Sequence, residues 1–139
     1  MDGLKNQGAK ETGCKARFDL IPPYPLWELA KAYNIGGGNK YHERSWEKGI
    51  SYGSIIGALL RHVYKWIAGE KVDPEDGIHH LAHAAWCCFT LMEYQQTHME
   101  LDDRSSNKTL LNLMNSCEYK MTWGMEDFSG SKYKDEPWE

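Results

Sequence analysis

Two long stretches with apolar residues at helical spacing, joined by a short acidic link, constrain the fold more than any other feature of this sequence. The first follows Ser51, a residue type that caps helix N-termini, and ends near Gly69. The second spans about His79 to His98. The link contains an Asp-Pro and an Asp-Gly pair, which favour turns. We therefore predict two helices that pack as an antiparallel hairpin.

The apolar positions predict which side of each helix is buried. In the first helix they are Ile55, Ile56, Leu59, Leu60, Val63, Trp66 and Ile67. In the second helix they are Leu81, Ala85, Trp86, Phe89 and Met92. We expect these two sides to form the core of the hairpin.

Two shorter helices flank the hairpin. One is predicted over residues 25–34, where a proline suits the first turn and the three glycines 36–38 end the helix. Residues 39–50 have no clean period, and we expect them to form an ordered loop. A weaker helix is predicted over residues 107–117. Together these elements predict an all-α fold.

The length of 139 residues suits one domain. We divide the chain into a flexible arm (1–15), a helical domain (16–100) and a C-terminal extension with a short helix and a tail (101–139). A hairpin with short helices buries little surface on its own, and small cores are often completed by oligomerisation. We expect self-association to a dimer or tetramer, in which two hairpins complete a four-helix bundle.

The composition argues against several classes of protein. A net charge of −4 and a pI near 5.9 argue against a nucleic acid polymer as partner, because such binding needs a basic surface. No apolar run approaches the roughly 20 residues that span a bilayer, and the N-terminus carries no apolar signal-peptide segment. We therefore expect no membrane partner and a cytoplasmic location, with the four cysteines as reduced thiols.

Histidines and carboxylates gather where the two long helices are expected to meet. His80 and His83 are three residues apart, so both project from one side of a helix, as a metal site requires. With carboxylates of the link they suit a divalent ion. The predicted metal ligands are Glu70, Asp73, Glu75, His80 and His83. His62 is predicted to be a further ligand or a general base, and Glu75 also a catalytic residue.

Less specific roles remain open for these residues. A single histidine is more often a helix-surface or capping residue than a ligand, and only the clustering favours a metal. His79 is four residues from His83 and forms a second candidate pair. Cys87 lies one turn after His83 and would extend a zinc site, but a buried, unreactive thiol is the commoner role.

A second group of residues suits a nucleotide. Three cations next to two flat aromatic rings can neutralise a triphosphate and stack on a base. The predicted substrate-binding residues are Lys40, Tyr41, Arg44, Trp46 and Arg61. The alternative is a solvated loop with extended Lys and Arg side chains. The glycines 36–38 lack the spacing of a phosphate-binding P-loop.

Five blocks of sequence, taken together and in this order, carry a resemblance. They are RFDLIP (17–22), KYHERSWEKG (40–49), RHVYKW (61–66), GEKVDPEDG (69–77) and HLAHAAW (80–86). This pattern resembles the phage dATP/dGTP diphosphohydrolases, the MazZ-type proteins linked to diaminopurine (Z) genomes. The resemblance covers about residues 16–93.

The resemblance implies hydrolysis of dGTP and dATP to the monophosphate and pyrophosphate, with a divalent metal ion (Mg, Mn or Co) as cofactor. It also implies a phage protein that acts in the host cytoplasm. More distantly, the hairpin is similar to the MazG-like all-α pyrophosphatases, which hold Mg with acids in E-x-x-E and E-x-x-D motifs. This chain departs from them, because the corresponding positions carry His62, Lys65, His80 and His83.

We therefore expect a metal-dependent purine deoxynucleotide pyrophosphohydrolase in phage nucleotide metabolism. Two alternatives remain: a His-rich metal phosphohydrolase that cuts at another bond, and a non-catalytic binding module stabilised by zinc. Covalent catalysis is poorly supported, because no G-x-S-x-G elbow is present.

Overall fold

The computed structural model describes residues 15–38 and 42–116, and the chain divides into two compact units between Asp103 and Arg104. The described part of the first unit contains the helices α1 (Pro23–Gly38), α2 (Tyr52–Ile67) and α3 (His80–Thr97) and the 3-10 turns η2 (Phe18–Leu20), η3 (Ser45–Lys48) and η4 (Met99–Leu101). The second unit contains α4 (Lys108–Met114), capped by the Asn107 side chain. No strand occurs among the described residues, so the predicted all-α class is confirmed.

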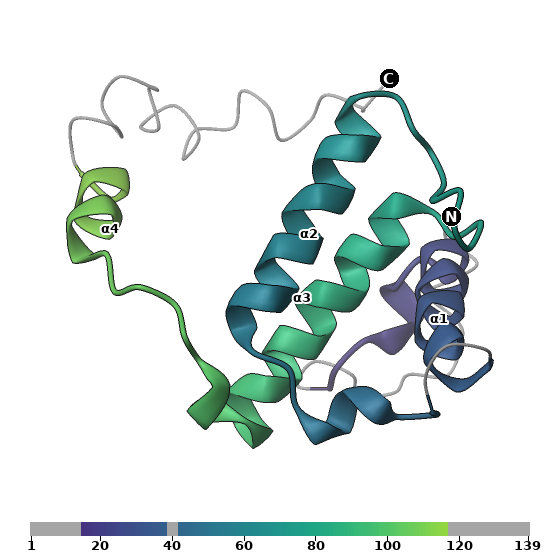
Figure 1. Ribbon diagram of the computed structural model, residues 1–139, viewed down its shortest axis with the longest axis horizontal. Helices are drawn as coiled ribbons and strands as arrows, with labels where there is room; N and C mark the ends of the chain where they lie inside the picture. Colours follow the sequence, from purple (N-terminus) through teal and green to yellow (C-terminus); the bar gives the residue numbers. More distant parts are fainter. Residues whose placement is uncertain (1–14, 39–41, 117–139) are drawn as a thin grey trace, which may run out of the picture. The chain divides into compact units, whose positions relative to one another are not determined.

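The predicted hairpin is present in the first unit. Helices α2 and α3 run antiparallel and pack along their lengths, and α1 packs against α3 (Figure 1). The Ser51 hydroxyl accepts a hydrogen bond from the backbone N–H of Ser54, as predicted for an N-cap. At the start of α3 the N-cap is His79, whose Nδ1 accepts a hydrogen bond from the N–H of Leu81 at 3.0 Å. His79 is therefore a capping residue.

Among the described residues, the core contains two groups of buried side chains. Tyr52 and Ile55 of α2 pack with Cys87 and Tyr94 of α3. Ala32 of α1 packs with Ile78 and Ala82 at the start of α3. Burial raises the pKa of the Cys87 thiol to about 11, so this cysteine is a core residue and an unreactive one.

The predicted buried side of α3 is wrong in part, since Trp86 packs against both core groups and Ala85 is half-buried. Leu81, Phe89 and Met92 are exposed, whereas the buried positions include the polar residues His80 and Thr90. The reason is that α3 packs against both α1 and α2, so it buries two sides, and small or polar residues fill much of them. On α2, the predicted core residues Leu60, Trp66 and Ile67 are exposed as well.

The exposed apolar side chains of α2 and α3 are of the kind that forms protein interfaces. A second copy of the chain as their partner, and the four-helix bundle that it would complete, stay predictions. Within residues 15–38 and 42–116, no helix combines the length and hydrophobicity needed to cross a membrane.

Helix α1 is longer than predicted. It begins at Pro23 and continues to Gly38, through the three glycines that were expected to end it. Glycine makes a helix less stable by about 1 kcal/mol per residue relative to alanine, but it does not block helical geometry. Ile35, at the start of this last turn, packs against the group formed by Ala32, Ile78 and Ala82.

Candidate metal centre

Main-chain hydrogen bonds hold the link between α2 and α3 against the first turn of α3. Val72 and His79 form an isolated β-bridge. The N–H of Asp73 donates to the carbonyl of Ile78 at 2.8 Å, and the N–H of His80 donates to the carbonyl of Lys71 at 3.0 Å. The carboxylates of the link are therefore fixed close to the histidines of α3.

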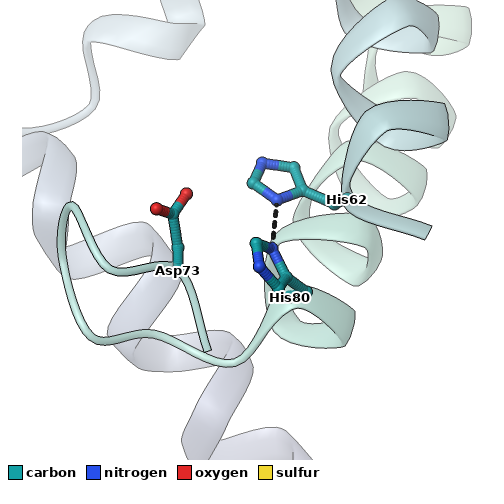
Figure 2. Close-up of side chains that lie close together, drawn as sticks. All are labelled: His62, Asp73 and His80. Carbon is teal, nitrogen blue, oxygen red and sulfur yellow. Dashed lines mark hydrogen bonds between the residues drawn. The ribbon is translucent and has the colours of Figure 1, made fainter. Parts of the chain in front are cut away.

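Three side chains from three segments meet at this point. His62 comes from α2, Asp73 from the link and His80 from α3 (Figure 2). The Nδ1 atoms of His62 and His80 lie 2.9 Å apart. One ligand atom from each of the three residues lies within 4.8 Å of the others. We call His62, Asp73 and His80 the first ligand group.

Glu70 orients the fully buried ring of His80 from its other side. The two contact through His80 Nε2 and Glu70 Oε1 at 2.7 Å. An ionised carboxylate can only accept, so the Nε2–H donates to Glu70. In a neutral ring this leaves the lone pair on Nδ1, which faces His62. Metal-binding histidines are commonly oriented by such a carboxylate.

A second group adjoins the first and shares Asp73 with it. His83 Nε2 contacts Asp76 Oδ2 at 2.9 Å, and ligand atoms of Asp73, Asp76 and His83 also lie within 4.8 Å of one another. The rings of His83 and His62 stack, with centroids 4.5 Å apart and planes inclined by 17°. We call Asp73, Asp76 and His83 the second ligand group.

The charges at the cluster are those that metal ligation requires. Burial lowers the pKa of His62, and the nearby rings of His83 and His80 lower it further, so His62 is neutral at pH 7. The backbone N–H of Glu75 lowers the pKa of Asp73 against an opposing effect of burial, and Asp73 is therefore ionised. Neutral imidazole and ionised carboxylate are the forms that bind a metal.

Two ring nitrogens of the first ligand group face each other at hydrogen-bond distance. The Nδ1 atoms of His62 and His80 lie 2.9 Å apart. A tetrahedral ion about 2.0–2.1 Å from each nitrogen would hold them about 3.3 Å apart, so only a small shift of one ring would admit it. Without a cation, one Nδ1–H donates a hydrogen bond to the other Nδ1. A cation held here would be bound by the lone pairs of both nitrogens. The donor set suits Mn, Co, Fe, Ni or Zn.

The structure brings together most of the predicted ligands, in different roles. Asp73, His80 and His83 lie in the two ligand groups, while Glu70 contacts the outer nitrogen of His80. Glu75 is exposed and belongs to neither group; its backbone N–H donates to Asp73 Oδ1 at 2.9 Å. Cys87 is in the core and is no member of either group.

The predicted substrate-binding residues are not gathered at this cluster. Arg61 is exposed on α2 next to His62. Arg44 pairs with Glu47 at 3.3 Å. Trp46 packs between the rings of Tyr33 and Tyr94, and its carbonyl accepts a hydrogen bond from the Tyr94 hydroxyl. Trp46 thus helps to hold η3 in place. Lys40 and Tyr41 lie outside the described residues.

Arg44 and Trp46 line a separate pocket of about 840 Å³. Its wall also contains three carboxylates, from Glu43, Glu47 and Glu93, which disfavour a triphosphate. Glu93 is ten residues beyond His83 on α3, so the two Cα atoms are about 15 Å apart along the helix. Within one chain, this pocket and the histidine cluster are therefore different places.

Two residues at the cluster were not among the predicted site residues. Asp76 was interpreted only as part of an Asp-Gly turn, although its Oδ2 contacts His83. Lys65 lies three residues after His62 on α2, and its charge lowers the pKa values of both His62 and Asp73. The signal for Lys65 was its spacing, since residues three apart share a helix face.

The contact between Glu70 and His80 predicts a measurable effect on metal affinity. Glu70→Gln replaces an ionised partner by a neutral one and should weaken Mn²⁺ or Co²⁺ binding by about 10–100-fold, the usual effect of removing such a partner. Calorimetric titration of the purified chain measures this. The matched control is Glu100→Gln, an exposed carboxylate beyond α3, which should leave the affinity unchanged. Equal affinities for wild type and Glu70→Gln would contradict this role of Glu70.

Comparison with known proteins identifies the family. The family model described as dATP/dGTP diphosphohydrolase, N-terminal, matches residues 5–104, which is more than half of the chain. A relative from Salmonella phage PMBT28 named dATP/dGTP diphosphohydrolase is 36% identical over 86 residues, which are 61% of this chain and 27% of the relative. The chain thus spans about a quarter of that relative's length. No solved structure was found to match. By the family match, this chain belongs to the dATP/dGTP diphosphohydrolase N-terminal family.

Proposed function

We propose that this chain hydrolyses dGTP and dATP to the monophosphate and pyrophosphate with the help of a divalent metal ion. The observation that carries the proposal is the first ligand group, in which two imidazole nitrogens and a carboxylate from three segments converge. The family and the phage relative support the substrate class, because both are named for dATP and dGTP. A role in diaminopurine genome synthesis is a prediction from the resemblance alone.

In this proposal, different residues of the chain bind the metal, accept a proton and stabilise phosphate charge. His62, Asp73 and His80 would hold the ion, with Glu70 fixing the ring of His80. A bound divalent ion supplies Lewis-acid stabilisation of phosphate charge and lowers the pKa of water.

The exposed carboxylate of Glu75 is the candidate base that takes a proton from the attacking water. The water oxygen bonds to phosphorus as the P–O bond between the α- and β-phosphates breaks. Lys65 and Arg61, on the same helix as His62, offset the negative charge of the triphosphate.

The alternative functions differ in their products. A phosphohydrolase that cuts at another bond releases phosphate or triphosphate, and a zinc-stabilised binding module releases nothing. Incubation of the full chain with each purine dNTP and Mg²⁺, Mn²⁺ or Co²⁺, followed by ion-exchange chromatography, separates the three. We expect dGMP or dAMP with an equal amount of pyrophosphate. Phosphate, triphosphate or no product at all would contradict the proposal.

Water labelled with ¹⁸O locates the bond that forms. Attack on the α-phosphorus places the label in the monophosphate, and attack on the β-phosphorus places it in pyrophosphate.

His62→Gln should lower turnover by at least about 100-fold, since removing a ligand costs at least as much as removing a residue that orients one. His98→Gln, at the far end of α3, is the matched control and should keep full activity.

Lys65 and Arg44 give a second, comparative prediction. Lys65→Gln should raise the KM for dGTP about 10-fold, because a charge-assisted contact to phosphate contributes about 1.5 kcal/mol. Arg44→Gln should raise KM much less, because Arg44 pairs with Glu47 in an acidic pocket apart from the cluster. Steady-state kinetics of both variants tests this. A larger KM effect from Arg44→Gln would show that the pocket near η3 binds the triphosphate.

A further inference from the structure

The two ligand groups are adjacent and have Asp73 in common. The first offers two imidazole nitrogens and a carboxylate, and the second offers one imidazole nitrogen and two carboxylates. The stacked rings of His62 and His83 belong to different groups and lie side by side. We propose that the cluster binds two divalent cations, with the Asp73 carboxylate bridging them. This inference rests on the metal dependence in the proposed function and adds a second ion site made by Asp76 and His83.

Backbone N–H groups orient the carboxylates of Asp73 and Asp76, the two acidic residues of the proposed second ion site. Asp73 Oδ1 accepts from the N–H of Glu75 at 2.9 Å, and Asp76 Oδ1 accepts from the N–H of Ile78 at 2.9 Å. Each aspartate therefore has its orientation fixed through one oxygen. The other oxygen of Asp76 contacts His83 Nε2 at 2.9 Å, the same spacing as between the two nitrogens of the first group. Both pairs face each other at hydrogen-bond distance, so a cation bound by either pair would replace the proton that the pair shares.

Sharing one carboxylate keeps the two ions close. Paired catalytic ions in hydrolases of phosphate compounds lie about 3.5–4 Å apart and act on one phosphate group from two sides. The two sites also differ in chemistry, since the nitrogen-rich first group favours softer ions such as Co²⁺ or Zn²⁺, and the oxygen-rich second group favours Mn²⁺ or Mg²⁺. We expect two separable binding steps when Co²⁺ is added.

The test counts ions without reference to activity. The full chain, freed of metal with a chelator, is titrated with Mn²⁺ by calorimetry, and the loaded protein is examined by electron paramagnetic resonance. We expect two ions per chain and a spectrum of a coupled Mn²⁺ pair. One ion per chain with an uncoupled spectrum would overturn the second site; the proposed function would still stand if hydrolysis persists. No bound ion would overturn both the second site and the metal dependence.

Two isosteric substitutions in the link sharpen the test. Asp76→Asn keeps the oxygen that accepts from Ile78 and replaces the one that faces His83 by an amide nitrogen, so one ion and an uncoupled spectrum are expected. Glu75→Gln makes the same change one position away, outside both groups, and should keep two ions. Retention of both ions in Asp76→Asn, or loss of one in Glu75→Gln, would contradict the assignment. His83→Gln provides a second variant of the same site, and circular dichroism verifies folding of each.

Discussion

The main-chain pairing of the link with the start of α3 is the constraint on which the candidate site depends. Without the Val72–His79 bridge and the hydrogen bonds next to it, the carboxylates of the link would have no fixed position relative to His80. Gly77, with φ of +74°, lets the chain reverse direction inside this short segment. The N–H of Gly77 donates to the carbonyl of Asp73 at 2.7 Å and closes the turn. The backbone therefore positions the acidic residues, and the helices position the histidines.

The burial of His80 is the energetic counterpart of this arrangement. A completely buried imidazole must have partners for its nitrogens, because burying a polar group without a hydrogen bond costs about 1–3 kcal/mol. Glu70 satisfies one nitrogen, and His62 faces the other. In an apolar core, a buried histidine without partners would lower the stability of the fold. Between the link and α2, His80 has partners for both nitrogens and is placed where it could bind a ligand.

Much of the fold could be predicted from local sequence signals. The Ser51 cap and the Asp-Pro and Asp-Gly pairs are short-range features, and they correctly gave the hairpin and its link. The buried side of α3 could not be obtained in this way. Its identity depends on packing against α1, which lies more than forty residues earlier in the chain, and the polar residues His80 and Thr90 occupy buried positions there. The glycine end of α1 failed because glycine weakens a helix without forbidding it.

The residue types of the candidate site could be predicted from the sequence, but the role of each residue could not. Clustering of histidines and acids on either side of a turn pointed to this end of the hairpin. It could not show that Glu70 lies behind His80, that His79 caps the helix, or that Asp76 contacts His83, because these roles depend on how the link folds back. Arg44 and Trp46 were predicted to bind the substrate from the chemistry of their side chains alone, and the length of α3 separates their pocket from the histidines.

In the proposed function, histidines of both hairpin helices bind a divalent ion directly. X-ray absorption at the cobalt edge of the Co²⁺-loaded full chain tests it most directly, because imidazole rings give a recognisable scattering pattern beyond the first shell. We expect a mixed nitrogen and oxygen shell with scattering from at least two imidazoles, reduced in His62→Gln. A shell of oxygen atoms alone, unchanged in His62→Gln, would contradict the account and move the ion away from the histidines.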